Sequence, residues 1–381
     1  MSKAFPTLFS PIKLGHLHLR NRIVFGAHTP NMAEAGLPGA RHLGYYKERA
    51  RGGAAMIVVE PMPAHATGIL TRGNFICGSD EVIPHFRKIA DAVHAEGAAI
   101  CQQIYHVGGH GDQDNSWQPY WSPSGQVSFH DPWGSHAMSE SQIEDIIDGF
   151  VQAARRIHQA GFDGCDLFAG YNCLIDQFWS PITNRRQDKW GGSLENRVRF
   201  VREITSRIRA LIGQDFIIGL TVTGAEPHPG GLSLEDKLDI AGWLDERGLV
   251  DYFSVGTGSY LTDFSKIIPS FQYDMNVGVA DARALRAVIA RRAPSVRAAF
   301  RGCWIRAIRV HQARDALSVG VAADGCGCGA WHAAGAGVDG GVACITSITS
   351  VAGVGRGVAG ARIGEHASGV VVYQDVARIA E

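Results

Sequence analysis

The chain of 381 residues is long enough for two average domains or for one large fold with a single core, such as an α/β barrel. Its 36 Lys and Arg residues nearly balance its 37 Asp and Glu residues, so its formal net charge of −1 excludes a strong attraction to nucleic acid or to anionic membranes. The composition favours a function on small molecules.

The amino terminus, MSKAFPTLFSPIKLGHLHLR, lacks the apolar core of a secretion signal, and no stretch approaches the roughly 18 apolar residues of a membrane span. We therefore expect a cytoplasmic protein. Its eight cysteines are scattered, which indicates free thiols rather than a disulfide framework. Cys326 and Cys328 form a lone C-x-C, which is too weak a pattern to predict a metal site.

Short apolar segments alternate with longer amphipathic segments from residue 22 onward, which is typical of βα units around a parallel sheet. The pattern predicts strands at Ile23–His28, Ala55–Glu60, Ala99–His106, Gly164–Ala169, Phe216–Val222 and Tyr252–Gly256. Apolar residues at every third or fourth position predict helices at Arg41–Arg51, Ile83–Glu96, Glu140–Ala160, Glu195–Ile212 and Leu234–Arg247. This rhythm indicates an α/β fold of the (β/α)8 TIM-barrel type, which needs two more units.

The loop Gly108–Met138 is rich in Trp, Pro, Ser, Gly and His and is too long for a plain connection, so we expect it to cover one end of the barrel. Farther on, ADARALRAVIARRA predicts a helix and SVRAAF, at 295–300, a seventh strand.

The pattern then fails, because residues 320–369 consist mainly of Gly, Ala and Val and predict no eighth strand. We expect a barrel domain at 1–318 and an atypical Gly/Ala-rich segment at 319–381. This segment could be a flexible tail, a diverged end of the barrel or the product of a reading-frame slip. The frame slip is favoured, because a barrel that must close needs regular patterning.

In a βα barrel, the residues at the carboxyl ends of the strands carry the chemistry. Here most of these side chains are uncharged, which suits a planar heteroaromatic ligand that needs hydrogen bonds more than counter-ions. The candidates include Ala27, His28, Glu60, Gln103, His106, Tyr171, Cys173, Thr221 and Tyr260.

Each candidate also has a purely structural interpretation. Gln103 and His106 could be satisfied polar groups of the core, Cys173 could be a small buried apolar residue, and Tyr171 and Tyr260 could simply pack. Neither a P-loop nor a dinucleotide-binding glycine motif follows a strand, so a Rossmann site is not supported.

Four long motifs are too specific to be explained by the fold alone: PTLFSPIKLGHLHLRNRIVFGAHT, YYKERARGGAAMIVVE, QQIYHVGG and LIDQFWSPITNRRQDKWGGSLENRVRF. These motifs resemble the flavin-dependent old yellow enzyme family. They are most similar to its long-chain branch, which includes trimethylamine dehydrogenase, 2,4-dienoyl-CoA reductase and the demethylases of dimethylglycine and N-methylproline. Within that branch, LIDQFWSP and EPHPGGLSLED favour the demethylases.

The resemblance implies an FMN-binding TIM barrel with non-covalent FMN at its carboxyl-terminal mouth. By similarity, Ala27 and His28 would line the flavin and Gln103 would bind its pyrimidine edge, since an amide can both donate and accept there. Glu60, Thr221 and Gly302 are the other expected cofactor contacts. The iron–sulfur segment of the long branch is not visible in this sequence.

The departures from the family pattern concern the catalytic groups. The usual H-x-x-[HN]-x-Y of strand four is replaced by Phe168, Tyr171 and Cys173, which removes the carbonyl-binding pair and the tyrosine proton donor. Thr221 replaces an arginine, which raises the cost of an anionic reduced flavin. Tyr171, Cys173 and Tyr260 are therefore the predicted catalytic residues.

Three functions are compared. The first is FMN-dependent oxidative demethylation of a small methylated amine, with Tyr171, Tyr260, Trp179 and tryptophans of the covering loop around the cation. The second is an NAD(P)H-dependent reductase of an enoate or dienoyl-CoA, and the third is an inactive, truncated barrel. A small-molecule substrate and a homo-oligomer are expected, without nucleic acid or membrane.

Overall fold

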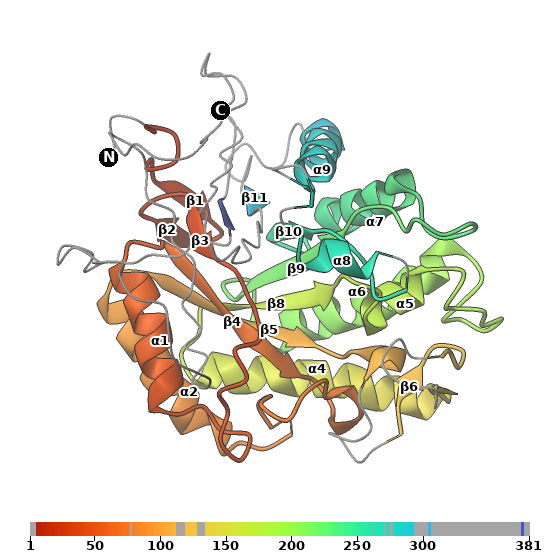
Figure 1. The fold of residues 1–381 in the computed structure, drawn as a ribbon, viewed down its shortest axis with the longest axis horizontal. Helices are drawn as coiled ribbons and strands as arrows, with labels where there is room; N and C mark the ends of the chain where they lie inside the picture. Colours follow the sequence, from red (N-terminus) through yellow and green to blue (C-terminus); the bar gives the residue numbers. More distant parts are fainter. Residues whose placement is uncertain are drawn as a thin grey trace, which may run out of the picture.

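The computed structural model describes residues 5–76, 78–111, 119–127, 134–261, 263–269, 272–273, 277–292, 304–305 and 375–376. The strands of its central sheet are β3 (Ile23–Phe25), β4 (Met56–Pro63), β5 (Ala99–Tyr105), β8 (Gly164–Ala169), β9 (Ile217–Thr223), β10 (Tyr252–Gly256), β11 (Trp304–Ile305) and β12 (Asp375–Val376). Their order is β11-β10-β9-β8-β5-β4-β3-β12 (Figure 1). All neighbours from β3 to β11 are parallel, whereas β12 is antiparallel to β3.

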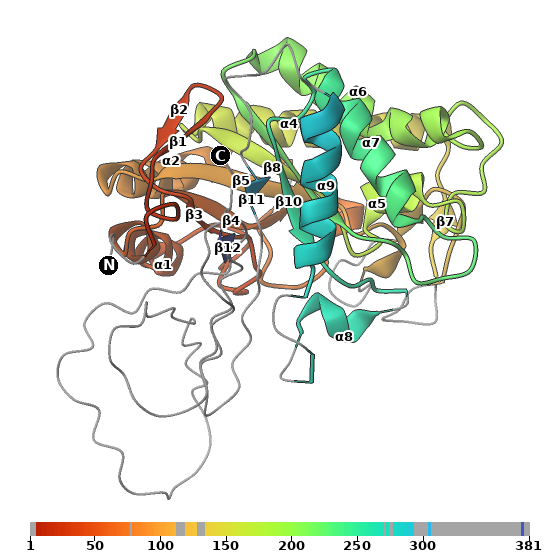
Figure 2. The same cartoon turned by 90° about the horizontal axis from the view of Figure 1, so that it is seen from above.

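Long helices follow the strands and cover the outer face of the sheet (Figure 2). They are α1 (Ala40–Arg51), α2 (Val82–Ala95), α4 (Glu140–Gln159), α6 (Leu194–Ile212), α7 (Leu234–Glu246) and α9 (Val279–Arg292). Three of them begin at a serine, because the hydroxyls of Ser139, Ser193 and Ser233 each accept a hydrogen bond from the backbone N–H three residues later. These caps fix where α4, α6 and α7 start.

Shorter elements complete the described chain. They are β1 (Ile12–Leu14), β2 (Leu17–Leu19), η1 (Ala66–Gly68), η2 (Gly108–His110), β6 (Trp121–Ser122), β7 (His136–Ala137), α5 (Leu174–Trp179) and α8 (Phe264–Ile267).

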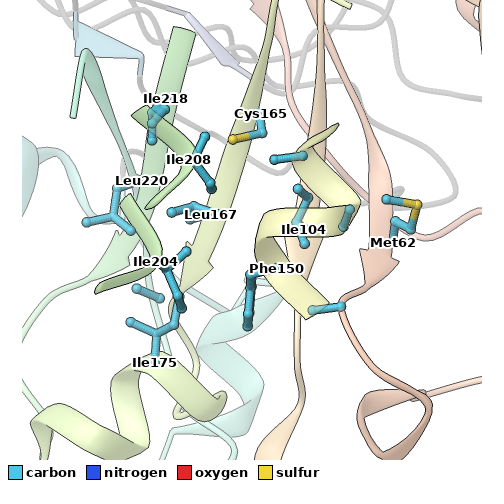
Figure 3. Packing of buried hydrophobic residues seen from close by; sticks show 14 of the residues in the cluster. Met62, Ile104, Phe150, Cys165, Leu167, Ile175, Ile204, Ile208, Ile218 and Leu220 are labelled. Carbon is cyan, nitrogen blue, oxygen red and sulfur yellow. The ribbon is translucent and has the colours of Figure 1, made fainter. Parts of the chain in front are cut away.

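The side chains of the strands alternate between two apolar layers. Ile104, Leu167 and Leu220 face outward and are buried in one cluster with Phe150 of α4 and Ile204 of α6 (Figure 3). The alternate residues form a second cluster inside the curve of the sheet, and the β1–β2 hairpin packs against it. This inner cluster consists of Leu14, Leu19, Val24, Ala55, Met56, Val58, Cys101, Ile217 and Tyr252. Burial on both faces explains why the strands read as nearly continuous apolar runs.

A bulge interrupts the alternation in β4. Val59 pairs with Gln102 and Met62 pairs with Ile104, so two residues of β4, Glu60 and Pro61, lie opposite the single Gln103. The Glu60 side chain consequently lies on the side of α1.

The predicted parallel α/β fold is confirmed, and the six predicted strands and five predicted helices match the structure apart from shifts at their ends. The helix expected from ADARALRAVIARRA is α9. Residues 295–300, the predicted seventh strand, lie outside the described residues, and β11 pairs with β10 slightly later in the chain. Of 319–381 only β12 is described, a short strand that the sequence does not predict. The complete eight-stranded barrel and the domain division stay predictions.

Candidate functional site

A buried polar cluster lies inside the sheet on three adjacent strands. Asp166 of β8 is only 1% exposed, and its Oδ1 accepts hydrogen bonds from the Thr221 hydroxyl of β9 at 2.6 Å and from Gln103 Nε2 of β5 at 2.9 Å. Gln103 Nε2 also lies 3.4 Å from Thr221 Oγ1. Burial raises the pKa of Asp166, while the hydrogen bonds from Thr221 and Gln103 oppose that rise.

Of the two polar atoms of the Gln103 amide, only the nitrogen is therefore hydrogen-bonded within the described residues. Its nitrogen is bound to Asp166 and Thr221, whereas among the described residues no hydrogen bond reaches its Oε1. Gln103 is 4% exposed, and a carbonyl oxygen in such a place normally has a donor. This oxygen is suited to a ligand N–H.

Apolar and aromatic side chains from three segments surround the carboxyl ends of these strands. We call Tyr105, Phe168, Tyr171, Tyr260 and Phe264 the aromatic rim. Tyr171 contacts Phe168 edge-on with ring centroids 5.2 Å apart and Tyr260 at 6.3 Å, and Tyr260 lies 5.9 Å from Phe264. Of these residues, Tyr105, Phe168 and Tyr171 are buried together with Cys173 in one cluster.

Tyr171 and Asn172 adopt left-handed backbone conformations, with φ of 58° and 63°. For a tyrosine this conformation is costly, and such strain is typical of sites where the fold imposes it. Glycine at 256 is part of the reason that the ring can lie here, because a Cβ atom on it would come within 3.2 Å of the Tyr171 hydroxyl.

The polar groups of Asn172 hold this turn in place. Its backbone N–H donates to Asp176, its side-chain oxygen lies 2.9 Å from Nε2 of His110, and its amide nitrogen donates to Glu226 at 3.1 Å. Asp176 in turn forms a buried ion pair with Lys237 of α7. The turn after β8 is thus tied to three other segments of the fold.

Cys173 lies in the same turn and is 2% exposed. Burial raises the pKa of its thiol well above the ordinary value, and Asp176 adds to the rise. The thiol therefore stays protonated and is a weak nucleophile.

His106, at the end of β5, is a satisfied core group. Its Nδ1 accepts the Gly108 N–H at 2.9 Å, its Nε2 lies 3.0 Å from the Thr67 hydroxyl, and burial lowers its pKa to about 3. The structural interpretation holds for this residue.

The remaining predicted residues are placed as follows. His28 Nε2 lies 2.5 Å from the Tyr45 hydroxyl of α1, and Ala27 packs against the inner cluster. Glu60 is fully buried with its carboxylate 2.9 Å from His42 of α1, and burial raises its pKa. The structure thus does not bring Glu60 together with Gln103, and Gly302 lies outside the described residues.

Trp179, which was expected to lie beside the bound cation, needs a correction. Trp179 is 1% exposed within the outer apolar cluster, where Lys237 Nζ lies 5.4 Å from its ring centre. The structure does not place it on the aromatic rim.

Asp166, Asn172 and His110 are absent from the sequence-based candidates. Asp166 could have been found, since it is the one acidic residue in the apolar strand GCDLFA and it shares the inward alternation of Phe168. The side-chain partners of Asn172, Glu226 and His110, are 54 and 62 residues away in sequence, and no local pattern indicates them.

The family model of the NADH:flavin oxidoreductase / NADH oxidase family matches residues 7–261. The chain belongs to that family. The resemblance to old yellow enzymes is confirmed, and so is the expected class, a family of FMN-linked oxidoreductases. No helix among the described residues is long and apolar enough to cross a membrane, and these residues contain no group of three potential metal ligands.

Two curated relatives are named after N-methylated amino acids. The N,N-dimethylglycine/sarcosine dehydrogenase of Chromohalobacter salexigens is 39% identical over 71% of this chain and 40% of its own length. The probable N-methylproline demethylase of Rhizobium meliloti is 40% identical over 69% of this chain and 39% of its own. A solved 2-naphthoyl-CoA reductase superposes with a TM-score of 0.69 and 28% identity, covering 74% of this chain and 44% of that one. The chain thus spans about two fifths of the length of these two curated relatives.

Proposed function

We propose that the chain is an FMN-dependent oxidoreductase that removes an N-methyl group from a small methylated amine by oxidation. The observation that carries this proposal is the aromatic rim at the strand ends, where Phe168 and Tyr171 occupy the positions at which a carbonyl-binding pair is usual. The names of two relatives add support.

The described residues fit a flavin at this place. The isoalloxazine ring carries an N–H between two carbonyl groups, and the free Oε1 of Gln103 is a matching acceptor. Ala27, His28 and Thr221 would line the ring. Glu60 would contribute only through its backbone, because its carboxylate is paired with His42. Gly302 would help to hold the phosphate in a complete eight-stranded barrel.

Bound FMN would supply a two-electron acceptor for a hydride from the carbon next to nitrogen. The protein would bind and orient the amine. Tyrosine rings attract methylated ammonium groups by cation–π contact, worth about 0.5–2 kcal/mol per ring, and Tyr171 and Tyr260 meet nearly at right angles, with an interplanar angle of 84°. Two perpendicular faces would hold a rounded cation better than a flat carbonyl compound.

The test is anaerobic reduction of the FMN-loaded protein, followed by its visible absorption. N-Methylproline or dimethylglycine should bleach the flavin band, whereas proline and glycine, which lack the methyl group, should not. If no methylated amine bleaches the flavin, the proposed demethylation is wrong.

A second candidate is an NAD(P)H-dependent enoate or enoyl-CoA reductase. It is favoured by the two adjacent phenols of the rim, either of which could donate a proton. NADH oxidation driven by 2-cyclohexenone or a dienoyl-CoA would support it. A colourless protein after incubation with excess FMN would contradict both functions and support the inactive barrel.

A further inference from the structure

Asp166 is a buried acidic group that the proposed reaction does not use. It lies on β8 between Gln103 of β5 and Thr221 of β9 and accepts a hydrogen bond from each of them on the same oxygen, Oδ1. The position has room for this arrangement, because glycine at 219 leaves space for the Tyr252 ring, whose atoms would lie 2.0 Å from a Cβ atom there.

The carboxyl group decides how its two neighbours can act. The Thr221 hydroxyl has one proton and donates it to Asp166, so toward any other partner Thr221 can only accept. The Gln103 nitrogen is likewise directed to Asp166 and Thr221, which leaves Oε1 as the free atom of the amide. Without Asp166, none of these contacts would prevent the Gln103 amide from rotating by about 180°, which would exchange the positions of its oxygen and nitrogen.

We propose that Asp166 is a positioning residue of the cofactor site, which turns the Gln103 amide so that its oxygen is presented to the imide N–H of the flavin. The inference rests on the proposed binding of FMN and adds to it the residue that fixes the polarity of the site. The proposal predicts that the site prefers a flavin with an N–H group at its pyrimidine edge. The preference should be lost when residue 166 can no longer accept a hydrogen bond from the Gln103 amide.

The experiment compares the dissociation constants of FMN and N3-methyl-FMN, measured by quenching of flavin fluorescence. The wild-type chain should prefer FMN by about tenfold or more, since N3-methyl-FMN has no N–H for the Gln103 oxygen to accept. Gln103→Ala gives the discrimination that the bulk of the methyl group causes alone. In Asp166→Ala the ratio of the two dissociation constants should fall to the Gln103→Ala value. In Asp166→Asn, whose side-chain oxygen can still accept a hydrogen bond from Gln103, the ratio should stay at the wild-type value.

Two further variants make the result decisive. Asp163→Asn removes a carboxylate just before the start of the same strand, where it accepts the Ile100 N–H, and should leave the flavin ratio unchanged. If Asp166→Ala does not fold, Asp166→Ser replaces it, because serine keeps a small polar side chain. For Asp166→Ser, a ratio of dissociation constants between the wild-type and Gln103→Ala values would support the proposal.

Wild-type discrimination in both Asp166→Ala and Asp166→Ser would overturn the role of Asp166 and leave the proposed function intact. A wild-type chain that binds neither flavin would overturn the proposed function, and this inference with it.

Discussion

The backbone N–H of Tyr260 donates a hydrogen bond to the carbonyl oxygen of Tyr171, with the two atoms 3.0 Å apart. This bond joins the turn after β8 to the turn after β10 and brings two predicted catalytic residues to the same place. Both tyrosines then contribute rings to the aromatic rim. The relative roles of ring and hydroxyl can be separated there by substitution.

Tyr171→Phe should distinguish the two proposed reactions. In amine oxidation the ring is the useful part, so kcat should change by less than about threefold, whereas Tyr171→Leu should raise KM because a cation–π contact is lost. In alkene reduction by a phenol donor, Tyr171→Phe should lower kcat by about 10²–10⁴. Steady-state kinetics with each substrate class gives the answer, and Tyr260→Phe is the parallel measurement.

Asn172 should tolerate glycine better than alanine. Both variants lose the contacts to His110 and Glu226. Only alanine is also strained by the left-handed backbone conformation at φ 63°, which glycine adopts readily. We expect Asn172→Ala to be less stable than Asn172→Gly by about 1–2 kcal/mol in urea unfolding. Equal stabilities of the two variants would show that the backbone conformation costs little here.

Lys237→Met should be strongly destabilising. Lys237 and Asp176 have side chains that are 4% and 2% exposed, so removal of the lysine leaves a buried carboxylate without its cation. A loss of about 3–5 kcal/mol is expected, and the double variant Lys237→Met with Asp176→Leu should recover part of it. The exposed pair of Arg207 and Glu144 is the control, and Arg207→Met should cost less than about 1 kcal/mol. A double variant no more stable than Lys237→Met would contradict this account.

His106 and His94 should respond to pH with opposite signs. The pKa of His106 is lowered to about 3 in the folded chain, so the unfolded chain binds more protons between this value and about 6.5, and stability is lost as the pH falls through that range. The slope is at most about 1.4 kcal/mol per pH unit. His94 donates a hydrogen bond to the Asp163 carboxylate, which raises the pKa of His94, so its contribution to stability is present below about 6.5 and is lost as the pH rises.

Urea unfolding of His106→Gln and His94→Gln from pH 5 to pH 8 would measure both effects. His106→Gln should flatten the loss of stability on acidification, while His94→Gln should make it steeper. A wild-type slope in His106→Gln would mean that this histidine is not buried as a neutral group.

Local patterns were sufficient to predict six central strands and the long helices, apart from shifts at their ends. The period of the apolar residues predicts α4 and α6 because their stripes pack against the outer face of the sheet, as Phe150 and Ile204 do. The positions of Tyr171, Cys173 and Tyr260 follow because parallel strands end at one edge. Their proximity in the structure agrees with the prediction, although their catalytic roles stay proposals.

The sequence could not indicate features that depend on distant partners. Trp179 resembles a site aromatic in its motif, yet it is buried under Lys237, which comes from α7. The alternation of β4 predicts an inward Glu60, but the bulge cannot be read from composition. Asp166 accepts its hydrogen bonds from residues that are 55 and 63 positions away in sequence.

The bulge in β4 keeps two acids apart. With regular alternation, Glu60 would point into the same interior layer as Asp166. Two carboxylates in an interior without water would repel each other unless one of them took up a proton. The extra residue instead turns Glu60 outward to His42, where a basic partner is available. A deletion of Pro61 would therefore do more than shorten a strand, since it would move a second negative charge beneath the place proposed for the flavin.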